Sequence, residues 1–579
     1  MEAATTTQRP REEERVSSFA KSLFLGEIHE ELVFPFPKPD DAEQDRIRSL
    51  IASLREVPYD ARRVEEERWV GDDVIRELGE RGLTGLYVPR EYGGQGLSQT
   101  GYCRVSETFS QIDATLAVVM GVHQSIGMKG IVIFGTEEQK ARFLPDLASG
   151  RKLAGFALTE PEAGSDVRGM RSRAERQADG SWRLNGHKHY IGNGAKGDVL
   201  VTFAATGDGE HTAFIIEKGM DGFEVGRRFD TLGLRGNDLR ELFYNDVRIP
   251  PENVLGEPGQ GFRIAMHVLN NGRLSVGTNS VGGSKQLLDL AIAHVRERRQ
   301  FGRHLADFEL VQDKIGWMVS YLFGLESMAY LSVGLVDAGV PDYSLESAIV
   351  KVAGTEFLWY QVNRALQLAG GAGYMRDLPY EKSLRDSRIF PIFEGANDVM
   401  RAFVALAGMK PLGEELSGLG DVSLGDPIGT IGVLVEYVAG RIQREMRPDR
   451  ITRAHDELAP LAGSVSDQVK RLRSVSEGLL REHKGAIAER QLHQKRVSDA
   501  VSDIYAQIAV LSRVTSIFRD HGVEPSGQER YIAQTFCERA AGRVDLSLDQ
   551  VEANDDERMV AIAKLALKRG EYGYAFFED

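Results

Sequence analysis

The sequence predicts a mainly α-helical protein with a central β domain and a helical extension at its C-terminal end. Three observations support this fold class. Apolar residues recur at helical intervals in residues 41–150 and again in residues 259–410. In residues 151–258 the pattern changes to short β-branched and aromatic runs separated by turn dipeptides. Helical spacing returns over most of residues 411–579.

An N-terminal segment precedes the first helical domain, and the two divide at about residue 40. The N-terminal segment, residues 1–40, begins with a polar, charged stretch that we expect to be disordered. The N-terminal helical domain, residues 41–150, has apolar side chains three or four positions apart, and residues 137–148 predict its last helix. The run Gly93-Gly-Gln-Gly96 predicts a tight loop within this domain.

The β domain, residues 151–258, contains two clear strand patterns. Residues 199–203 and 212–216 are rich in β-branched and aromatic side chains. Asp208-Gly209 lies between them and predicts a turn, as does Asp221-Gly222 further on. This region therefore reads as a compact β domain within an otherwise helical chain.

The C-terminal helical bundle, residues 259–410, has long amphipathic patterns. Residues 287–298 and 344–366 are the clearest predicted helices. Asn397 and Asp398 predict a cap for a short helix over residues 399–405. The Gly-rich stretch from Met409 to Pro427 predicts a connector to the extension.

Within the extension, residues 411–579, apolar residues in 469–518 recur at heptad-like spacing. Residues 428–453 are the part for which we expect membrane contact, because their apolar side chains share one helical face with arginines away from its centre. The same face could instead pack on the protein's own bundle, and the sequence leaves both possibilities open. The apolar residues concerned are Ile431, Leu434, Val435, Val438, Ile442 and Met446.

Composition narrows the possible functions and locations. A net charge of −15 argues against nucleic acid as a partner, and two cysteines in 579 residues fit a reducing compartment without a disulfide framework. We find no run of about 18 apolar residues, and so predict no membrane-spanning helix. The N-terminal residues mix acids with bases, so we expect a cytoplasmic bacterial protein, either free or peripheral to the inner membrane. A mitochondrial protein whose transit peptide has been removed is the alternative.

The most informative stretch is residues 388–398, in which Glu394 stands between Phe393 and Gly395 behind an apolar run. An apolar setting raises the pKa of a carboxyl group and makes its carboxylate a stronger base. Gly395 permits the close approach of a ligand or another backbone segment. Taken alone, the stretch favours a surface glutamate at the start of a helix.

Two further motifs favour a catalytic interpretation. Residues 156–166 read Phe-Ala-Leu-Thr-Glu-Pro-Glu-Ala-Gly-Ser-Asp, and residues 298–302 read Arg-Arg-Gln-Phe-Gly. With Glu394, they stand in the order and at the spacing of the acyl-CoA dehydrogenase flavoproteins, and from residue 19 to about 409 the chain resembles that family. It is most similar to the very-long-chain acyl-CoA dehydrogenase branch and its complex I assembly-factor relative, which share its C-terminal extension and the pattern of residues 19–37.

This resemblance implies the acyl-CoA dehydrogenase fold and FAD-dependent α,β-dehydrogenation of long-chain acyl-CoA to trans-2-enoyl-CoA, a step of fatty acid β-oxidation. Electrons would pass to an electron-transferring flavoprotein, and the chain would form a homodimer. Two other functions remain open: a respiratory-complex assembly or scaffold protein with residual dehydrogenase activity, and an acyl-CoA oxidase. Oxygen reactivity of the reduced flavin would distinguish the oxidase.

By resemblance, Glu394 is the catalytic base, and its backbone N–H helps polarise the thioester carbonyl. Some relatives carry the base in a Glu-Arg pair on another helix, but the matching pair here is Gly272-Arg273, which leaves Glu394 without a rival. At Gly192 the family usually has Ser or Thr, whose hydroxyl contacts the flavin. Arg273 could instead be a salt-bridged structural residue, and Arg298 could belong to a solvated face.

The resemblance also implies two sets of binding residues. Arg298, Gln300, Phe301 and Gln367 would reach the flavin of the neighbouring subunit. The implied FAD contacts are Phe156, Leu158, Thr159, Gly164, Ser165, Tyr190, Ile191, Gly192, Arg298, Gln300, Phe301, Gln367, Gly371, Ala396, Asn397 and Asp398, and the implied substrate contacts are Ser165, Asn270, Asn271, Gly272, Arg273 and Gly395.

We find no Cys/His cluster with metal-ligand spacing, and expect His123, His187 and His189 to be structural.

Overall fold

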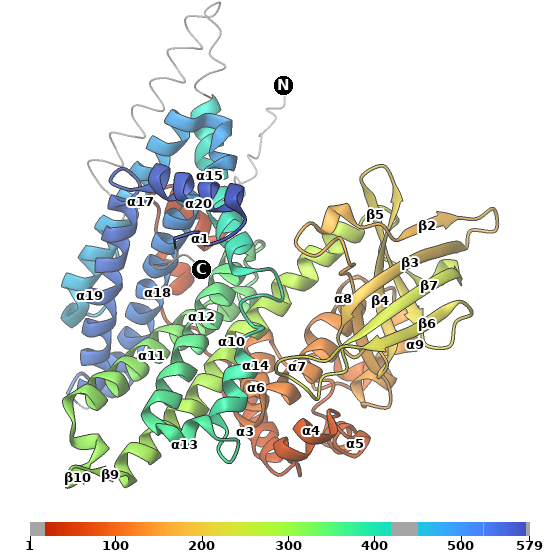
Figure 1. The fold of residues 1–579 in the computed structure, drawn as a ribbon, viewed down its shortest axis with the longest axis horizontal. Coiled ribbons are helices and arrows are strands. Elements are labelled where there is room, and N and C mark those ends of the chain that lie inside the picture. Colours follow the sequence, from red (N-terminus) through yellow and green to blue (C-terminus); the bar gives the residue numbers. More distant parts are fainter. Residues whose placement is uncertain (1–17, 419–449, 525, 575–579) are drawn as a thin grey trace, which may run out of the picture.

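A computed structural model describes residues 18–418, 450–524 and 526–574 (Figure 1). It shows the predicted fold class: helical regions surround one β domain, and a helical extension completes the chain. Most of the segment predicted to contact a membrane, residues 428–449, lies outside the described residues, as do residues 419–427 of the predicted connector.

Several helices of the N-terminal part of the chain begin at a short polar side chain that accepts hydrogen bonds from free backbone N–H groups. Asp113 accepts bonds from the N–H groups of Thr115 and Leu116, and Thr136 and Gln139 form a reciprocal capping box at the start of α9. This capping box explains why the predicted helix over residues 137–148 begins where it does. The helices are α1 (Phe19–Phe24), α2 (Glu30–Val33), α3 (Asp41–Arg55), α4 (Ala61–Glu67), α5 (Asp72–Glu80), α6 (Gln99–Ile112), α7 (Ala114–Gly121), the π-helical segment η2 (Val122–Met128), α8 (Lys129–Phe134) and α9 (Glu137–Ala148).

The β domain is built on one eight-stranded sheet in the order β6-β7-β3-β2-β4-β5-β8, with β1 pairing in parallel with β4. Both predicted strand patterns are present, in β4 and β5, and they pair antiparallel across the predicted turn at Asp208-Gly209. The strands are β1 (Leu153–Ala157), β2 (Arg173–Arg176), β3 (Trp182–Ile191), β4 (Gly197–Gly207), β5 (Glu210–Glu217), β6 (Phe223–Arg228), β7 (Arg240–Ile249) and β8 (Val254–Leu255).

The C-terminal bundle is more continuous than its sequence pattern predicts. The helix expected over 287–298 begins much earlier, and the helix expected over 399–405 runs on to Gly418 through Pro411, so Asn397 and Asp398 belong to its first turn rather than to a cap before it. The elements are α10 (Gly261–Glu297), β9 (Arg299–Gln300), β10 (Arg303–His304), α11 (Glu309–Asp337), α12 (Ser344–Ala369), α13 (Gly371–Tyr374), α14 (Tyr380–Ser387) and α15 (Asn397–Gly418).

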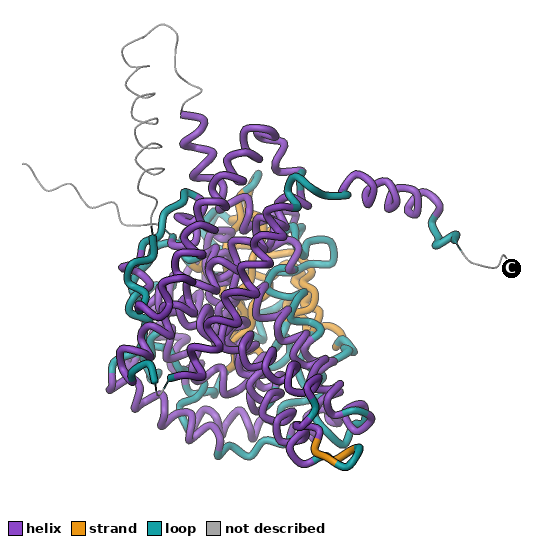
Figure 2. Tube along the Cα trace, turned by 90° about the vertical axis from the view of Figure 1, so that its left-hand side faces the viewer, coloured by secondary structure: helices purple, strands orange, loops and turns teal. Residues whose placement is uncertain are grey.

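The extension packs its long helix α18 against α11 and α15 of the bundle. A 3-10 turn over Lys484–Glu489 separates α17 from α18, so the heptad-like stretch is two helices rather than one. Figure 2 shows α20 leading away from the body of the molecule, and none of its residues is buried. The helices are α17 (Ala459–His483), α18 (Gln491–His521), α19 (Gly527–Asp549) and α20 (Asp556–Arg569).

Two described stretches are long and apolar enough to cross a membrane by length and composition, which corrects the expectation that no such run exists. They are Ala114–Phe134 and Glu309–Asp337. Within the fold, 61% and 72% of their most apolar windows are buried against other elements, as in core helices of a folded domain.

Candidate active site

Glu394 lies in a strained turn between α14 and α15. Its φ is +56°, and that of Gly395 is +95°, so two successive residues occupy the left-handed region. A non-glycine residue in this region costs backbone energy, and such residues cluster at functional sites. A Cβ at Gly395 would also come within 2.7 Å of Met400 Cε, so the turn is closely packed as well as strained.

The carboxylate of Glu394 is held in a desolvated position. Its Oε2 atom is buried and has no hydrogen-bond partner in the described part of the chain. Burial raises the pKa of Glu394 to about 7, and the nearby charges of Arg273 and Lys351 partly offset that rise. A buried, unpartnered carboxylate oxygen is costly for the fold, and at a functional site it leaves a base free to accept a proton.

Gly272, in the middle of α10, provides the space that this carboxylate occupies. A Cβ at Gly272 would lie 2.8 Å from Glu394 Oε2 and 2.9 Å from Ile126 Cγ2. The sequence showed only that Gly272 cannot act as a base. The structure adds that a side chain at this position would displace the base at Glu394.

Arg273 and Lys351 hold two successive carbonyl groups of the backbone, those of Glu394 and Gly395. Arg273 Nε donates to the carbonyl oxygen of Glu394 at 3.2 Å, and its Nη1 donates to Asn270 Oδ1 at 2.8 Å. Lys351 Nζ, on α12, donates to the carbonyl oxygen of Gly395 at 2.7 Å. Both cations are buried, and burial lowers the pKa of Lys351 to about 7.

Lys351 was not among the predicted site residues, although the sequence contains a signal for it. It stands between Val350 and Val352 in an apolar stretch of α12, and a lysine is rarely buried without a specific partner. Its second acceptor is Asn397 Oδ1 at 2.8 Å, whose amide group in turn donates to Thr355 Oγ1. Asn397 therefore reaches the base through Lys351.

The π-helical segment η2 connects the base to the β domain. A Cβ at Gly192 would lie 3.0 Å from Val122 Cγ2, and Ile126, one turn further along η2, lies beside Gly272. One short segment thus contacts both the surroundings of Glu394 and the strand end at which the family has a flavin-contacting hydroxyl. π-Helical turns are rare and are frequent at functional sites.

The predicted flavin loop after β1 is fixed to β3 by a buried ion pair. Lys188 Nζ donates to Glu160 Oε1 at 2.7 Å and to the carbonyl oxygen of Leu158 at 3.0 Å. The N–H of His189 donates to the carbonyl oxygen of Thr159 at 2.9 Å. These contacts bring residues 158–160 against the end of β3, and Gly164 and Ser165 beyond them are exposed.

The predicted residues at the end of β3 lie beside this loop. Tyr190 has a φ of +58° and is 57% exposed, with its ring against His189 and Phe229, whereas Ile191 is buried in the sheet core. Phe156, on β1, is buried against Phe203. An exposed aromatic ring next to an exposed loop provides one open face for a planar ligand.

Five other predicted flavin residues lie elsewhere in the same chain. Arg298 directly precedes the exposed β9–β10 hairpin, Gln300 and Phe301 lie in it, and Phe301 is 92% exposed. Gln367, near the end of α12, and Gly371, at the start of α13, are also exposed. Figure 1 shows the hairpin and the sheet of the β domain at opposite ends of the molecule, so one chain does not bring the two groups together.

The remaining residues that were predicted to contact the substrate or FAD differ in their exposure to solvent. Asn271 is buried and donates to the carbonyl oxygen of His267 and to Tyr343 Oη, both at 3.0 Å, so its side chain is used within the fold. Asp398 is exposed, and Ala396 is partly buried.

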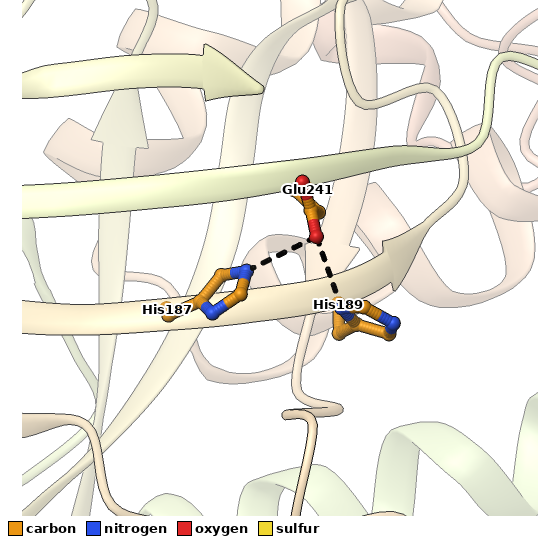
Figure 3. A group of neighbouring side chains, drawn as sticks. All are labelled: His187, His189 and Glu241. Atoms are coloured by element: carbon orange, nitrogen blue, oxygen red, sulfur yellow. Dashed lines mark ion pairs between the residues drawn. The ribbon is translucent and has the colours of Figure 1, made fainter. Parts of the chain in front are cut away.

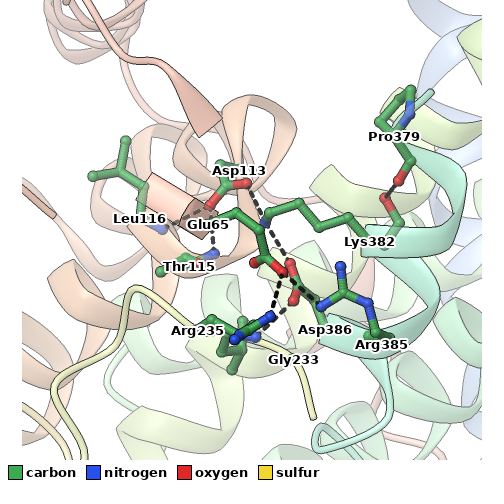
Figure 4. Close-up of polar contacts among 12 residues, drawn as sticks. Glu65, Asp113, Thr115, Leu116, Gly233, Arg235, Pro379, Lys382, Arg385 and Asp386 are labelled. Atoms are coloured by element: carbon green, nitrogen blue, oxygen red, sulfur yellow. Dashed lines mark hydrogen bonds and ion pairs between the residues drawn. The ribbon is translucent and has the colours of Figure 1, made fainter. Parts of the chain in front are cut away.

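A polar network joins three parts of the chain just before the catalytic turn (Figure 4). Lys382 Nζ, on α14, lies 2.6 Å from both Asp113 Oδ2 of the N-terminal domain and Asp386 Oδ2. Asp386 Oδ1 accepts a bond from the N–H of Leu234 in the β domain. On the same helix, Arg385 pairs with Glu65 at 2.8 Å. This network fixes α14, and with it the start of the segment that leads to Glu394.

These features fit a flavin dinucleotide. A planar ring system needs an open aromatic face beside backbone groups, which the region around Tyr190 and the exposed Gly164-Ser165 loop provide. A pyrophosphate needs a fixed cation, and exposed arginines such as Arg298 can bond two phosphate oxygens at once. Gly371 adds an open position, since a Cβ there would meet nothing within 4 Å.

One further group of side chains was not foreseen from the sequence. His187, His189 and Glu241 come together on the sheet, with their possible ligand atoms within 4.8 Å of one another. The fold therefore brings together three side chains of types that bind metal ions, and their spacing in the sequence does not reveal this.

Comparisons with known protein families match nearly the whole length. Models of the acyl-CoA dehydrogenase N-terminal, middle and C-terminal domains match residues 41–151, 155–247 and 259–409, and a model of the ACAD9/ACADV C-terminal domain matches residues 456–572.

Individual relatives show the same similarity. The very-long-chain specific acyl-CoA dehydrogenase of Homo sapiens mitochondria is 36% identical over 98% of this chain and 90% of that protein. The solved structure of an acyl-CoA dehydrogenase complexed with FAD from Bacillus anthracis has a TM-score of 0.82, with 29% identity over 95% of both chains. A structure described as an electron-transferring flavoprotein of Acidaminococcus fermentans has a TM-score of 0.61, with 33% identity over 64% of this chain and 98% of that one.

Proposed function

Because this chain belongs to the acyl-CoA dehydrogenase family, we propose that Glu394 is the base of its reaction. The chain is an FAD-dependent acyl-CoA dehydrogenase that introduces a double bond between the α and β carbons of an acyl-CoA thioester. The observation that carries the assignment of Glu394 is its buried Oε2 atom, which has no partner among the described residues.

Proton removal depends on the surroundings of Glu394. The α-proton of the thioester passes to a carboxylate whose pKa burial raises, so the base matches a weak carbon acid better than a solvated glutamate would. Arg273 and Lys351 hold the carbonyl groups of Glu394 and Gly395, which would help to keep the carboxylate in one position toward the substrate. The N–H of Glu394 itself would help polarise the thioester oxygen.

When bound, FAD supplies the acceptor for the hydride that leaves the β-carbon. The protein groups that would hold it are the loop containing Thr159, Gly164 and Ser165, and the open face at Tyr190. Gly192 brings no hydroxyl to this face, so a backbone group or water would bond the flavin there.

We propose that the active form is a homodimer. Arg298, Gln300 and Phe301 are exposed at one end of the molecule, and the flavin loop lies in the β domain at the other end. A single chain cannot place both groups on one dinucleotide. A second copy could bring its hairpin to the β-domain side and complete each site.

The names of the relatives support a proposal for the substrate class. We propose long-chain acyl-CoA as the substrate, because the human relative is named as very-long-chain specific. We propose an electron-transferring flavoprotein as the electron acceptor.

We propose that the protein is cytoplasmic. We also propose that residues 428–453 make peripheral contact with a membrane. The membrane proposal rests on the amphipathic sequence alone, and liposome flotation with and without anionic lipid tests it.

Anaerobic titration of the yellow holoprotein tests the proposed function. Palmitoyl-CoA should bleach the flavin absorbance faster than octanoyl-CoA, and an electron-transferring flavoprotein should restore it faster than dissolved oxygen. Reoxidation by oxygen at the higher rate would instead identify an oxidase. No bleaching by any acyl-CoA would leave a scaffold role and overturn the proposal.

A further inference from the structure

Two histidines and one glutamate of the β-domain sheet converge on one another (Figure 3). His187 and His189 are two positions apart on β3, so they lie on the same face of the sheet, while Lys188 between them faces the core. Glu241 comes from the neighbouring strand β7. The register of β3 and β7 shifts between Lys188 and Ile191, and irregularities of this kind redirect side chains.

The distances within this His-His-Glu cluster do not describe hydrogen bonds. Glu241 Oε1 lies 3.7 Å from His187 Nε2 and 3.6 Å from His189 Nδ1. Hydrogen bonds between nitrogen and oxygen are normally about 2.7–3.2 Å long. Both ring nitrogens are buried and lack a hydrogen-bond partner among the residues that the structure describes. Two orphaned imidazole nitrogens beside one carboxylate oxygen need an explanation, because each costs desolvation energy.

A metal ion at the centre would satisfy all three atoms. Ligand atoms about 2.1 Å from a tetrahedral Zn²⁺ ion lie about 3.4 Å from one another, close to the spacing of Glu241 Oε1 from both nitrogens. Neighbouring ligands of an octahedral ion at the same bond length would be about 3.0 Å apart, which fits less well. Imidazole and carboxylate are both ligands that Zn²⁺ accepts.

The surroundings fix the three side chains. His187 stacks on Phe243, with ring centroids 4.4 Å apart, and the ring of His189 packs against Tyr190 and Phe229. Arg227 Nε lies 3.3 Å from Glu241 Oε2, the oxygen that the ion would not use. Arg227 thereby orients the carboxylate, as hydrogen bonds to metal-binding carboxylates commonly do.

We propose that His187 Nε2, His189 Nδ1 and Glu241 Oε1 form a binding site for a divalent transition-metal ion, with Zn²⁺ as the preferred ion and water as its fourth ligand. The ion would join β3 to β7 directly beside Tyr190. Its expected effect is structural: it would stabilise the strand end that carries residues 190–192 and their open face.

Metal binding to the tag-free, FAD-loaded protein tests this proposal without any measurement of turnover. After removal of metals with a chelator, Zn²⁺ should bind at one ion per chain in calorimetry, and Co²⁺ should give the intense visible bands of tetrahedral coordination. Glu241→Gln, which keeps the shape of the side chain, should weaken Zn²⁺ binding at least tenfold. His189→Gln should abolish the Co²⁺ bands, and FAD content together with a thermal melt shows whether this variant is folded.

A matched control removes an imidazole from a different pair. His483 and His493 stack on each other in the extension, so His493→Gln should bind Zn²⁺ like the wild type. The proposal is overturned if the wild type binds no Zn²⁺, or if Glu241→Gln binds it as tightly as the wild type does. Either result would make the three residues an ordinary polar cluster of the sheet.

Discussion

At the scale of single residues, the position of the Glu394 carboxylate depends on the absence of a side chain at Gly272 as much as on the nearby cations. Gly272 leaves room for the carboxylate of Glu394, and Arg273 and Lys351 hold the carbonyl groups of Glu394 and Gly395. The motifs alone were enough to propose Glu394 as the base. Lys351 was not proposed, because its role depends on the packing of α12 against the catalytic turn.

A methyl group at position 272 should displace the base. Gly272→Ala places a Cβ 2.8 Å from Glu394 Oε2, and a shift of the base by about 1 Å can lower kcat about 100-fold. The variant should keep its FAD. Gly283→Ala on the same helix is the matched control, since the nearest atom to its Cβ would be 3.4 Å away. Equal flavin-reduction rates in the two variants would contradict this account.

The pH dependence of kcat/KM should report the ionisation of Glu394. The carboxylate is the active form and its pKa is raised to about 7, so kcat/KM should fall as the pH drops below about 7. Arg273 lowers that pKa, so Arg273→Met should move the acidic limb to higher pH. Arg263→Met, on an exposed position of the same helix, should leave the limb in place. A limb that stays at the wild-type pH in Arg273→Met would exclude this electrostatic role.

At the scale of secondary-structure elements, helix α9 and strands β4 and β5 were predictable because local signals define them. α9 starts at a capping box, and Asp208-Gly209 joins the two strands. The extent of α10 was missed because five glycines, among them Gly272 and Gly277, interrupt its apolar pattern. The π-helical segment η2 has no sequence signal of this kind, so its position between the base and Gly192 emerges only from the fold.

The flavin loop should depend on the buried ion pair that fixes it to β3. Lys188→Met leaves the charge of Glu160 without its cation, and breaking a buried pair in this way costs about 3–5 kcal/mol of unfolding free energy. The variant should also retain less FAD than the wild type. Lys218→Met, which removes an exposed lysine that bonds the carbonyl oxygen of Ala195, should change little. Urea unfolding and flavin content measure both effects, and unchanged values in Lys188→Met would refute the role of the pair.

At the scale of the whole molecule, the order of domains could be read from the sequence, but their contacts could not. The network of Lys382, Asp113 and Asp386 joins residues that are remote in the chain, and only the fold brings them together. The separation of the β9–β10 hairpin from the β domain is likewise a property of the three-dimensional arrangement. It is the structural observation on which the proposal of a dimeric flavin site rests.

Loss of Arg298 should therefore weaken FAD binding without weakening the fold. Arg298 is exposed, so Arg298→Ala removes a cation proposed to bond the pyrophosphate and disturbs no core contact. FAD occupancy should fall while the melting temperature of the apoprotein stays the same. Arg296→Ala removes a neighbouring exposed arginine as the control. Equal FAD occupancy in the two variants would argue against the hairpin as part of the flavin site.

The most direct test of the central claim is anaerobic stopped-flow reduction of the flavin in Glu394→Gln. The amide cannot accept the α-proton, and no other carboxylate takes its place at Gly272. The variant should bind FAD and acyl-CoA as the wild type does, and its flavin should bleach slower by orders of magnitude. Bleaching near the wild-type rate would contradict the assignment of Glu394 as the base.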